Sequence, residues 1–154
     1  MRIKTLLALV IGLLAIACSK VNDKYDPSLC QNFIKEYSFE EAFHNDSEAY
    51  DSSLKNISQD DYASMIGQLK GIITQAYTEI TNISVLQNNT EMKQAYEDFN
   101  NKPMLQQYKI INGIVDDAKS RDLLNDSNLK AYMELEPIME NVAETDIEIK
   151  NRIR

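Results

Sequence analysis

One stretch of the chain carries a long helical repeat of apolar residues, at positions separated alternately by four and three. The repeat runs through Tyr62, Ile66, Leu69, Ile73, Ala76, Ile80 and Ile83. This spacing places the side chains on one face of an α-helix. Met65, Ile72 and Tyr77 widen that face into the broad stripe of a bundle helix rather than the narrow stripe of a two-stranded coiled coil. The sequence therefore predicts a long amphipathic helix that other helices must cover.

The start of this helix and its two glycines are also informative. Ser58 can cap the helix, and Asp60 and Asp61 would place negative charge in its first turn, where the helix dipole favours it. Gly67 and Gly71 form a G-x-x-x-G pattern, which leaves room for a close backbone neighbour. Each glycine costs about 1 kcal/mol of helix stability relative to alanine.

Signals before the long helix predict one helix and one loop. Asp26 followed by Pro27 is typical of a helix start, and apolar residues then recur at helical spacing as far as Tyr37. Ser38–Glu41 can form a capping box for a second short helix that buries Phe39, Ala42 and Phe43, or the first helix can continue to His44. The polar stretch from Asn45 to Asn56 is predicted to be a loop.

After a break at 88–90, the spacing predicts a helix over 92–99 that stops at 100–102. Pro103 then begins a further helix that extends to about Ser120. An alternative remains open within it, because β-branched residues on both sides of Asn112-Gly113 are also typical of a β-hairpin. We favour the helix, since an isolated hairpin is marginally stable and no third strand is evident.

The last part of the chain predicts two more helical segments. Asp126-Ser127 can cap a helix that continues to Leu135, and Pro137 must either start a new helix or kink this one. Ile138, Val142 and Ile149 then give an amphipathic helix to the C-terminus. With hydrophobic residues at 44%, 4 Gly and 3 Pro, the composition is that of a packed domain. The predicted fold class is all-α, a single helical bundle of five or six helices.

The N-terminus has the layout of a secretory signal. Arg2 and Lys4 precede an apolar run from Leu6 to Ala17, and small residues end it. Twelve residues of helix span about 18 Å, too short for a bilayer core of roughly 30 Å. The end of this segment, Ala15-Ile16-Ala17-Cys18, resembles the lipobox of bacterial lipoproteins.

The lipobox resemblance implies that residues 1–17 are a cleaved signal peptide and that Cys18 becomes a lipidated N-terminus. Residues 18–27 would then be that N-terminus and a tether, and residues 28–154 the helical bundle. Membrane attachment would be through the N-terminal lipid, since several acyl chains together make a stable anchor. Ser19 after the cysteine implies the outer membrane of a Gram-negative envelope, with either a periplasmic or a surface orientation. A plain cleaved signal, with Cys18 as an ordinary cysteine, remains the alternative.

The charge and the chemistry-bearing residues limit the function. The formal net charge is −8, and losing Arg2 and Lys4 would change it to −10, the wrong sign for nucleic-acid binding. Lipidation of Cys18 would leave Cys30 without a disulfide partner, so we expect Cys30 to be a buried, reduced core residue. His44 is the single histidine, and its Glu41-x-x-His44 spacing lacks the second pair that a di-metal bundle needs.

Three pairs of neighbouring acids could serve as acid and base, and they are Asp60/Asp61, Asp116/Asp117 and Glu134/Glu136. Residues one or two positions apart on a helix do not face each other, so we interpret these pairs as solvated surface charges. The sequence therefore predicts no catalytic residue, metal site or cofactor. The leading hypothesis is a lipid-anchored, non-catalytic envelope protein that binds a protein partner or supports an envelope assembly. The alternative is a lipoprotein that binds a small ligand or cation inside the bundle.

Overall fold

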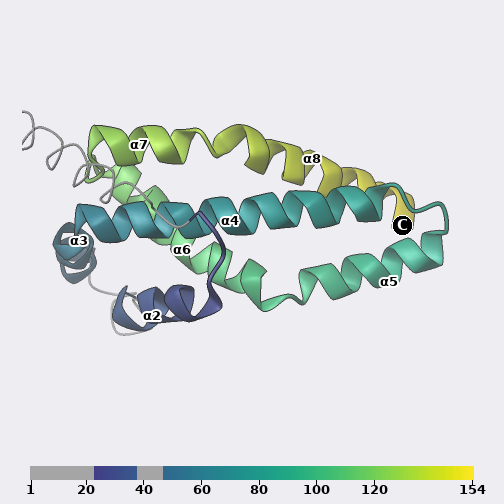
Figure 1. The fold of residues 1–154 in the computed structure, drawn as a ribbon, viewed down its shortest axis with the longest axis horizontal. Coiled ribbons are helices and arrows are strands. Elements are labelled where there is room, and N and C mark those ends of the chain that lie inside the picture. Colours follow the sequence, from purple (N-terminus) through teal and green to yellow (C-terminus); the bar gives the residue numbers. More distant parts are fainter. Residues whose placement is uncertain (1–22, 38–46) are drawn as a thin grey trace, which may run out of the picture.

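The long apolar repeat forms helix α4 (Gln59–Ser84), which runs the length of the molecule in the computed structural model (Figure 1). The structure describes residues 23–37 and 47–154. The Ser58 hydroxyl caps α4 by accepting a hydrogen bond of 3.0 Å from the Asp61 backbone nitrogen. Every residue of the predicted repeat is buried, as are Met65 and Ile72. Tyr77, at the edge of the stripe, is 41% exposed and does not widen the core.

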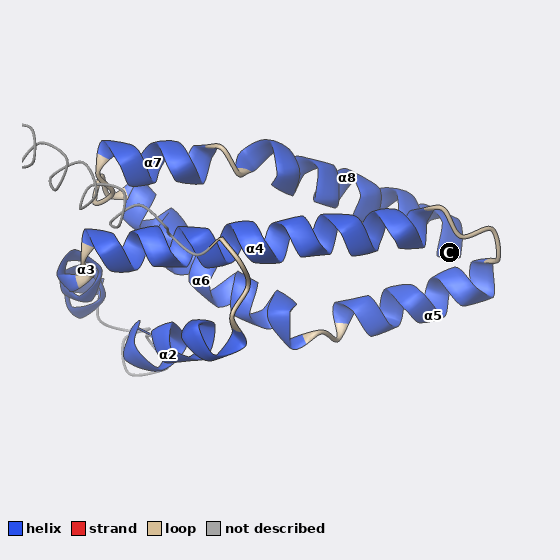
Figure 2. Cartoon of the chain, viewed as in Figure 1, coloured by secondary structure: helices blue, strands red, loops and turns tan. Residues whose placement is uncertain are grey.

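Further helices surround α4, and within the described residues there is no strand (Figure 2). They are α2 (Pro27–Tyr37), α3 (Ser47–Asn56), α5 (Asn89–Asn100), α6 (Pro103–Ser120), α7 (Asp126–Met133) and α8 (Glu136–Ile153). Helix α4 packs against α2, α5, α6, α7 and α8, and α5 also packs against α8. The prediction of an all-α helical bundle is confirmed.

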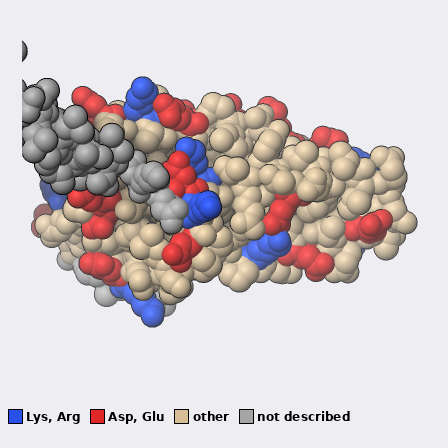
Figure 3. Space-filling model, viewed as in Figure 1, with Lys and Arg blue, Asp and Glu red and all other residues tan. Residues whose placement is uncertain are grey.

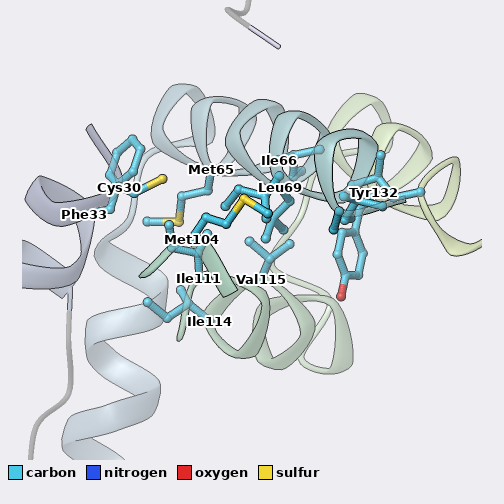
Figure 4. Close-up of a cluster of buried hydrophobic side chains, with 14 of the residues drawn as sticks. Cys30, Phe33, Met65, Ile66, Leu69, Met104, Ile111, Ile114, Val115 and Tyr132 are labelled. Atoms are coloured by element: carbon cyan, nitrogen blue, oxygen red, sulfur yellow. The ribbon is translucent and has the colours of Figure 1, made fainter. Parts of the chain in front are cut away.

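The core is continuous from α2 across α4 and α6 to α7 (Figure 4). Cys30 and Phe33 of α2 lie on the side of the core where Met65 of α4 is found. The α6 side chains Met104, Ile111, Ile114 and Val115 face them, and Tyr132 of α7 closes the cluster. Burial of these apolar side chains is the main force that holds the helices together.

Helix α3 corrects one prediction, because residues 47–56 are helical rather than a loop. Leu54 is fully buried, Ile57 is 4% exposed, and the Tyr50 hydroxyl donates a hydrogen bond to Asp117 of α6. Tyr50, Leu54 and Ile57 are spaced by four and three, so a short apolar face was present among many polar residues. Tertiary contacts with α6 stabilise this polar helix.

Helix α6 is continuous through Asn112 and Gly113, so the hairpin alternative is wrong. Ile111, Ile114 and Val115 are all buried, which is the helical pattern, and the Asn112 side chain accepts a hydrogen bond of 2.9 Å from Tyr132. A turn at that position would expose part of this apolar face.

The two C-terminal helices form where the sequence predicts them, but a different residue caps the first of them. The side chain of Asn125, rather than Asp126 or Ser127, caps α7 by accepting from the Asn128 backbone nitrogen at 2.8 Å. Pro137 lies in the first turn of α8, so it starts a new helix. Ile149 is fully buried, whereas Ile138 and Val142 are partly buried.

Several predictions fall outside the described residues. The signal segment, Cys18, the Ser38–Glu41 capping box and His44 belong to this group. Among the described residues, no helix is both long enough and apolar enough to cross a membrane.

Candidate functional site

A cavity of about 310 Å³ lies where α4, α5, α6 and α8 meet. Its apolar lining comes from Ile72, Ile73, Ala76, Ile80, Phe99, Leu105, Met139, Val142 and Ala143. Its polar lining residues are Asn100, Tyr108, Lys109 and Asp146. The cavity opens to solvent beside three exposed lining residues, which are Asn100, Lys109 and Ala143.

One polar contact links the turn between α5 and α6 to α4. Lys102 in this turn forms an ion pair of 2.5 Å with Glu79 of α4. Ala76 of α4 and Ala143 of α8 each contribute only a methyl group to the lining, which leaves space between helices that larger side chains would fill. Ala76 is a small, buried residue of the α4 apolar face, whereas Ala143 lies at the exposed mouth of the cavity.

The polar lining residues differ in their hydrogen-bond and ion-pair partners. Asp146 accepts a hydrogen bond from the Tyr96 hydroxyl and forms an ion pair with Lys150. The Asn100 side-chain nitrogen donates to the Tyr96 carbonyl at 3.0 Å. Burial raises the pKa of Tyr96, and its hydrogen bond to Asp146 raises that pKa further. Burial and the nearby Asp116 carboxylate raise the pKa of Tyr108, so both phenols are neutral at physiological pH.

A second feature is the segment Asp23–Asp26, here called the strap, which crosses α4. The buried Gln68 side chain holds it by donating to the Lys24 carbonyl at 3.1 Å and accepting from the Asp26 backbone nitrogen at 2.6 Å. Asp23 adds an ion pair of 2.7 Å with Lys70. These strap residues, which fall within the predicted tether, therefore lie against the bundle.

Gly71 makes the strap crossing possible. A methyl carbon on Gly71 would lie 2.4 Å from the Tyr25 backbone nitrogen and 2.9 Å from the Lys24 carbonyl carbon. Contacts this short do not occur between real side-chain and backbone atoms, so this position needs glycine. The close neighbour that the G-x-x-x-G pattern allows is an extended segment rather than another helix.

Cys30 is buried and free, as expected. Its thiol lies 3.5 Å from the Gln68 side-chain oxygen. Burial raises the pKa of Cys30 to about 11, and the nearby Asp26 carboxylate adds to the effect. The thiol is therefore protonated at neutral pH, the form that reacts slowly with alkylating agents.

The paired acids are used as structural partners. Asp61 accepts hydrogen bonds from Tyr37 and Ser58 at the start of α4. Asp117 accepts from Tyr50, and Glu136 forms an ion pair of 2.8 Å with Lys119. Within residues 23–37 and 47–154, no group of three or more His, Cys, Asp or Glu side chains could hold a metal ion.

Comparisons of the chain with protein families, with curated proteins and with solved structures found no match. The cavity and its residue chemistry therefore carry the functional argument.

The sequence did not single out the residues of this cavity. The apolar repeat placed Ile73, Ala76 and Ile80 in the core, but spacing alone does not distinguish a filled core from one with a gap. Lys109 was the available signal, since it is a charged residue directly between Tyr108 and two isoleucines.

Proposed function

We propose that this chain is a lipid-anchored, non-catalytic ligand-binding protein of a bacterial envelope. The cavity between α4, α5, α6 and α8 is the observation that carries the proposal. Its volume of about 310 Å³ lies at the lower end of the range of small-molecule sites, and its mainly apolar lining with a few polar groups at the rim is typical of such sites.

The cavity favours a small ligand over the protein partner that was the leading hypothesis from sequence. A stable protein interface buries about 800 Å² on each partner, and it needs a broad complementary surface. On the face shown in Figure 3, acidic and basic side chains gather on the left half, and the right half is mostly uncharged. The cavity, in contrast, is a concave site with a mainly apolar wall and a few polar lining residues.

The anchor is supported by the sequence Ala15-Ile16-Ala17-Cys18 after an apolar run. We expect Cys18→Ser to move the protein from the membrane fraction to the soluble fraction of the bacterial envelope. Fractionation followed by mass spectrometry of the N-terminal peptide measures both location and lipid. Ser19→Ala is the matched control and should remain with the membrane. A Cys18→Ser protein that stays membrane-bound would contradict the anchor.

The ligand site is tested with a neutral fluorescent probe, N-phenyl-1-naphthylamine, and the full chain carrying Cys18→Ser. We expect the probe to bind, and Ala143→Trp to weaken binding at least about tenfold, because an indole at this exposed lining position fills the cavity mouth. Fluorescence titration measures the affinity.

Glu144→Trp is the matched control for this experiment. It introduces the same side chain at the next, exposed position of α8, which does not line the cavity. We expect it to bind the probe as the parent chain does. Equal affinities in all three proteins, or no probe binding in any of them, would overturn the small-ligand proposal and favour the protein-partner hypothesis.

A further inference from the structure

The cavity is lined by one cation and one carboxylate, and only the carboxylate is already paired. Asp146 accepts from Tyr96 and forms an ion pair with Lys150. Within the described part of the chain, Lys109 forms no ion pair or hydrogen bond. Among the charged lining residues that the structure describes, Lys109 is therefore the one left to pair with a ligand.

Tyr108 is a half-buried residue of α6 that also lines the cavity. Its hydroxyl has no hydrogen-bond partner among residues 23–37 and 47–154. The phenol stays protonated at neutral pH because burial disfavours its charged form, and Asp116 acts in the same direction. The Asp116 carboxylate lies near this phenol, and adjacent residues on a helix do not face each other, so Lys109 is the group that can meet an anion. A carboxylate accepts hydrogen bonds from an ammonium group, and charge-assisted bonds of this type are the stronger ones.

The rest of the cavity is apolar. Ile72 and Ile80 of α4, Phe99 of α5 and Met139 of α8 form much of its wall. One water occupies about 30 Å³ in the liquid, so a volume of about 310 Å³ accommodates roughly ten groups of that size. An apolar body of this size would bury its surface against these side chains.

We infer that the cavity binds a monoanion with an apolar body of about ten carbon atoms, of the medium-chain fatty-acid class. The carboxylate lies at Lys109, and the hydrocarbon chain lies against Ile72, Ile80 and Phe99. This inference rests on the proposed function, because it names the ligand class of the same site. It adds a head-group specificity that an apolar cavity alone would not have.

Isothermal titration calorimetry tests the inference on the full chain carrying Cys18→Ser. The three probes have equal chain length and are decanoate, 1-decanol and decyltrimethylammonium. We expect decanoate to bind most tightly. Lys109→Met should weaken decanoate binding about three- to tenfold, because it removes a hydrogen-bonded charge from a partly exposed position. The same substitution should leave decanol binding unchanged.

Lys130→Met is the matched control, since Lys130 is an exposed lysine of α7 outside the cavity lining, and it should not change any affinity. Ala143→Trp should weaken decanoate and decanol alike. Equal binding of decanoate and decanol, both lost in Ala143→Trp, would overturn the anion inference while the ligand site stands. Tighter binding of the cation would also overturn it. If none of the probes bound, the proposal that this cavity is a ligand site would itself be overturned.

Discussion

Replacing Ile149 with alanine is expected to lower the free energy of unfolding by about 2 to 5 kcal/mol. Ile149 is fully buried in α8, the helix that packs against both α4 and α5. The substitution removes apolar contacts and leaves a cavity that the surrounding helices fill only partly. Urea unfolding followed by circular dichroism at 222 nm measures the change.

Ile147→Ala is the matched control for Ile149→Ala. It makes the same chemical change two residues earlier in the same helix, at a position that is 58% exposed. Both variants gain the same helix propensity from alanine, so the difference between them reports burial. We expect Ile147→Ala to stay within about 0.5 kcal/mol of the parent chain. If both variants lost similar amounts of unfolding free energy, Ile149 would not be the buried residue of this face of α8.

Replacing Gly71 with alanine is expected to destabilise the protein and release the strap. The added methyl group would meet the backbone of Tyr25 and Lys24, and a backbone cannot relieve the contact by changing rotamer. Overpacking of this kind typically costs about 1 to 3 kcal/mol. Hydrogen exchange should show faster exchange of the Asp26 amide, which donates to Gln68 in the parent chain.

Gly113→Ala is the control, and its effect on stability should be opposite to that of Gly71→Ala. Gly113 lies inside α6, and a methyl group there would meet no neighbouring atom within 4 Å beyond its own stretch of helix. We expect this variant to be more stable by up to about 1 kcal/mol, because alanine favours the helix. If both glycine variants were stabilised equally and the Asp26 amide kept its protection, the strap contact at Gly71 would be refuted.

The helices with regular apolar spacing could be predicted from the sequence, because burial on one side leaves a readable period. The α4 repeat, the cap at Ser58 and the helix starts at Pro27 and Pro103 all match the structure. Helix α3 could not be predicted with the same rule. Its apolar face has few members, and its stability depends on Tyr50 and Leu54 meeting distant parts of the chain.

The candidate site was harder to predict than the fold. A cavity is defined by volume left between helices, and a one-dimensional pattern carries no information on that volume. Lys109 and Asp146 are 37 residues apart in sequence and line the same space only because α6 and α8 both border it. The strap was missed for a related reason, since its backbone contacts depend on Gln68 and Gly71, which are far along the chain.

In the proposed lipoprotein, the strap would also determine where the bundle is attached to the membrane. Gly71 lies at the midpoint of α4, a 26-residue helix about 39 Å long, so half of the helix extends about 20 Å to each side of the crossing. In the proposed lipoprotein, five peptide steps from Cys18 to Asp23 reach at most about 18 Å. That reach is of the same order as half of α4, so an upright α4 would bring one of its ends close to the bilayer surface. In the proposed lipoprotein, the attachment point would therefore lie near the middle of the bundle rather than at one of its ends.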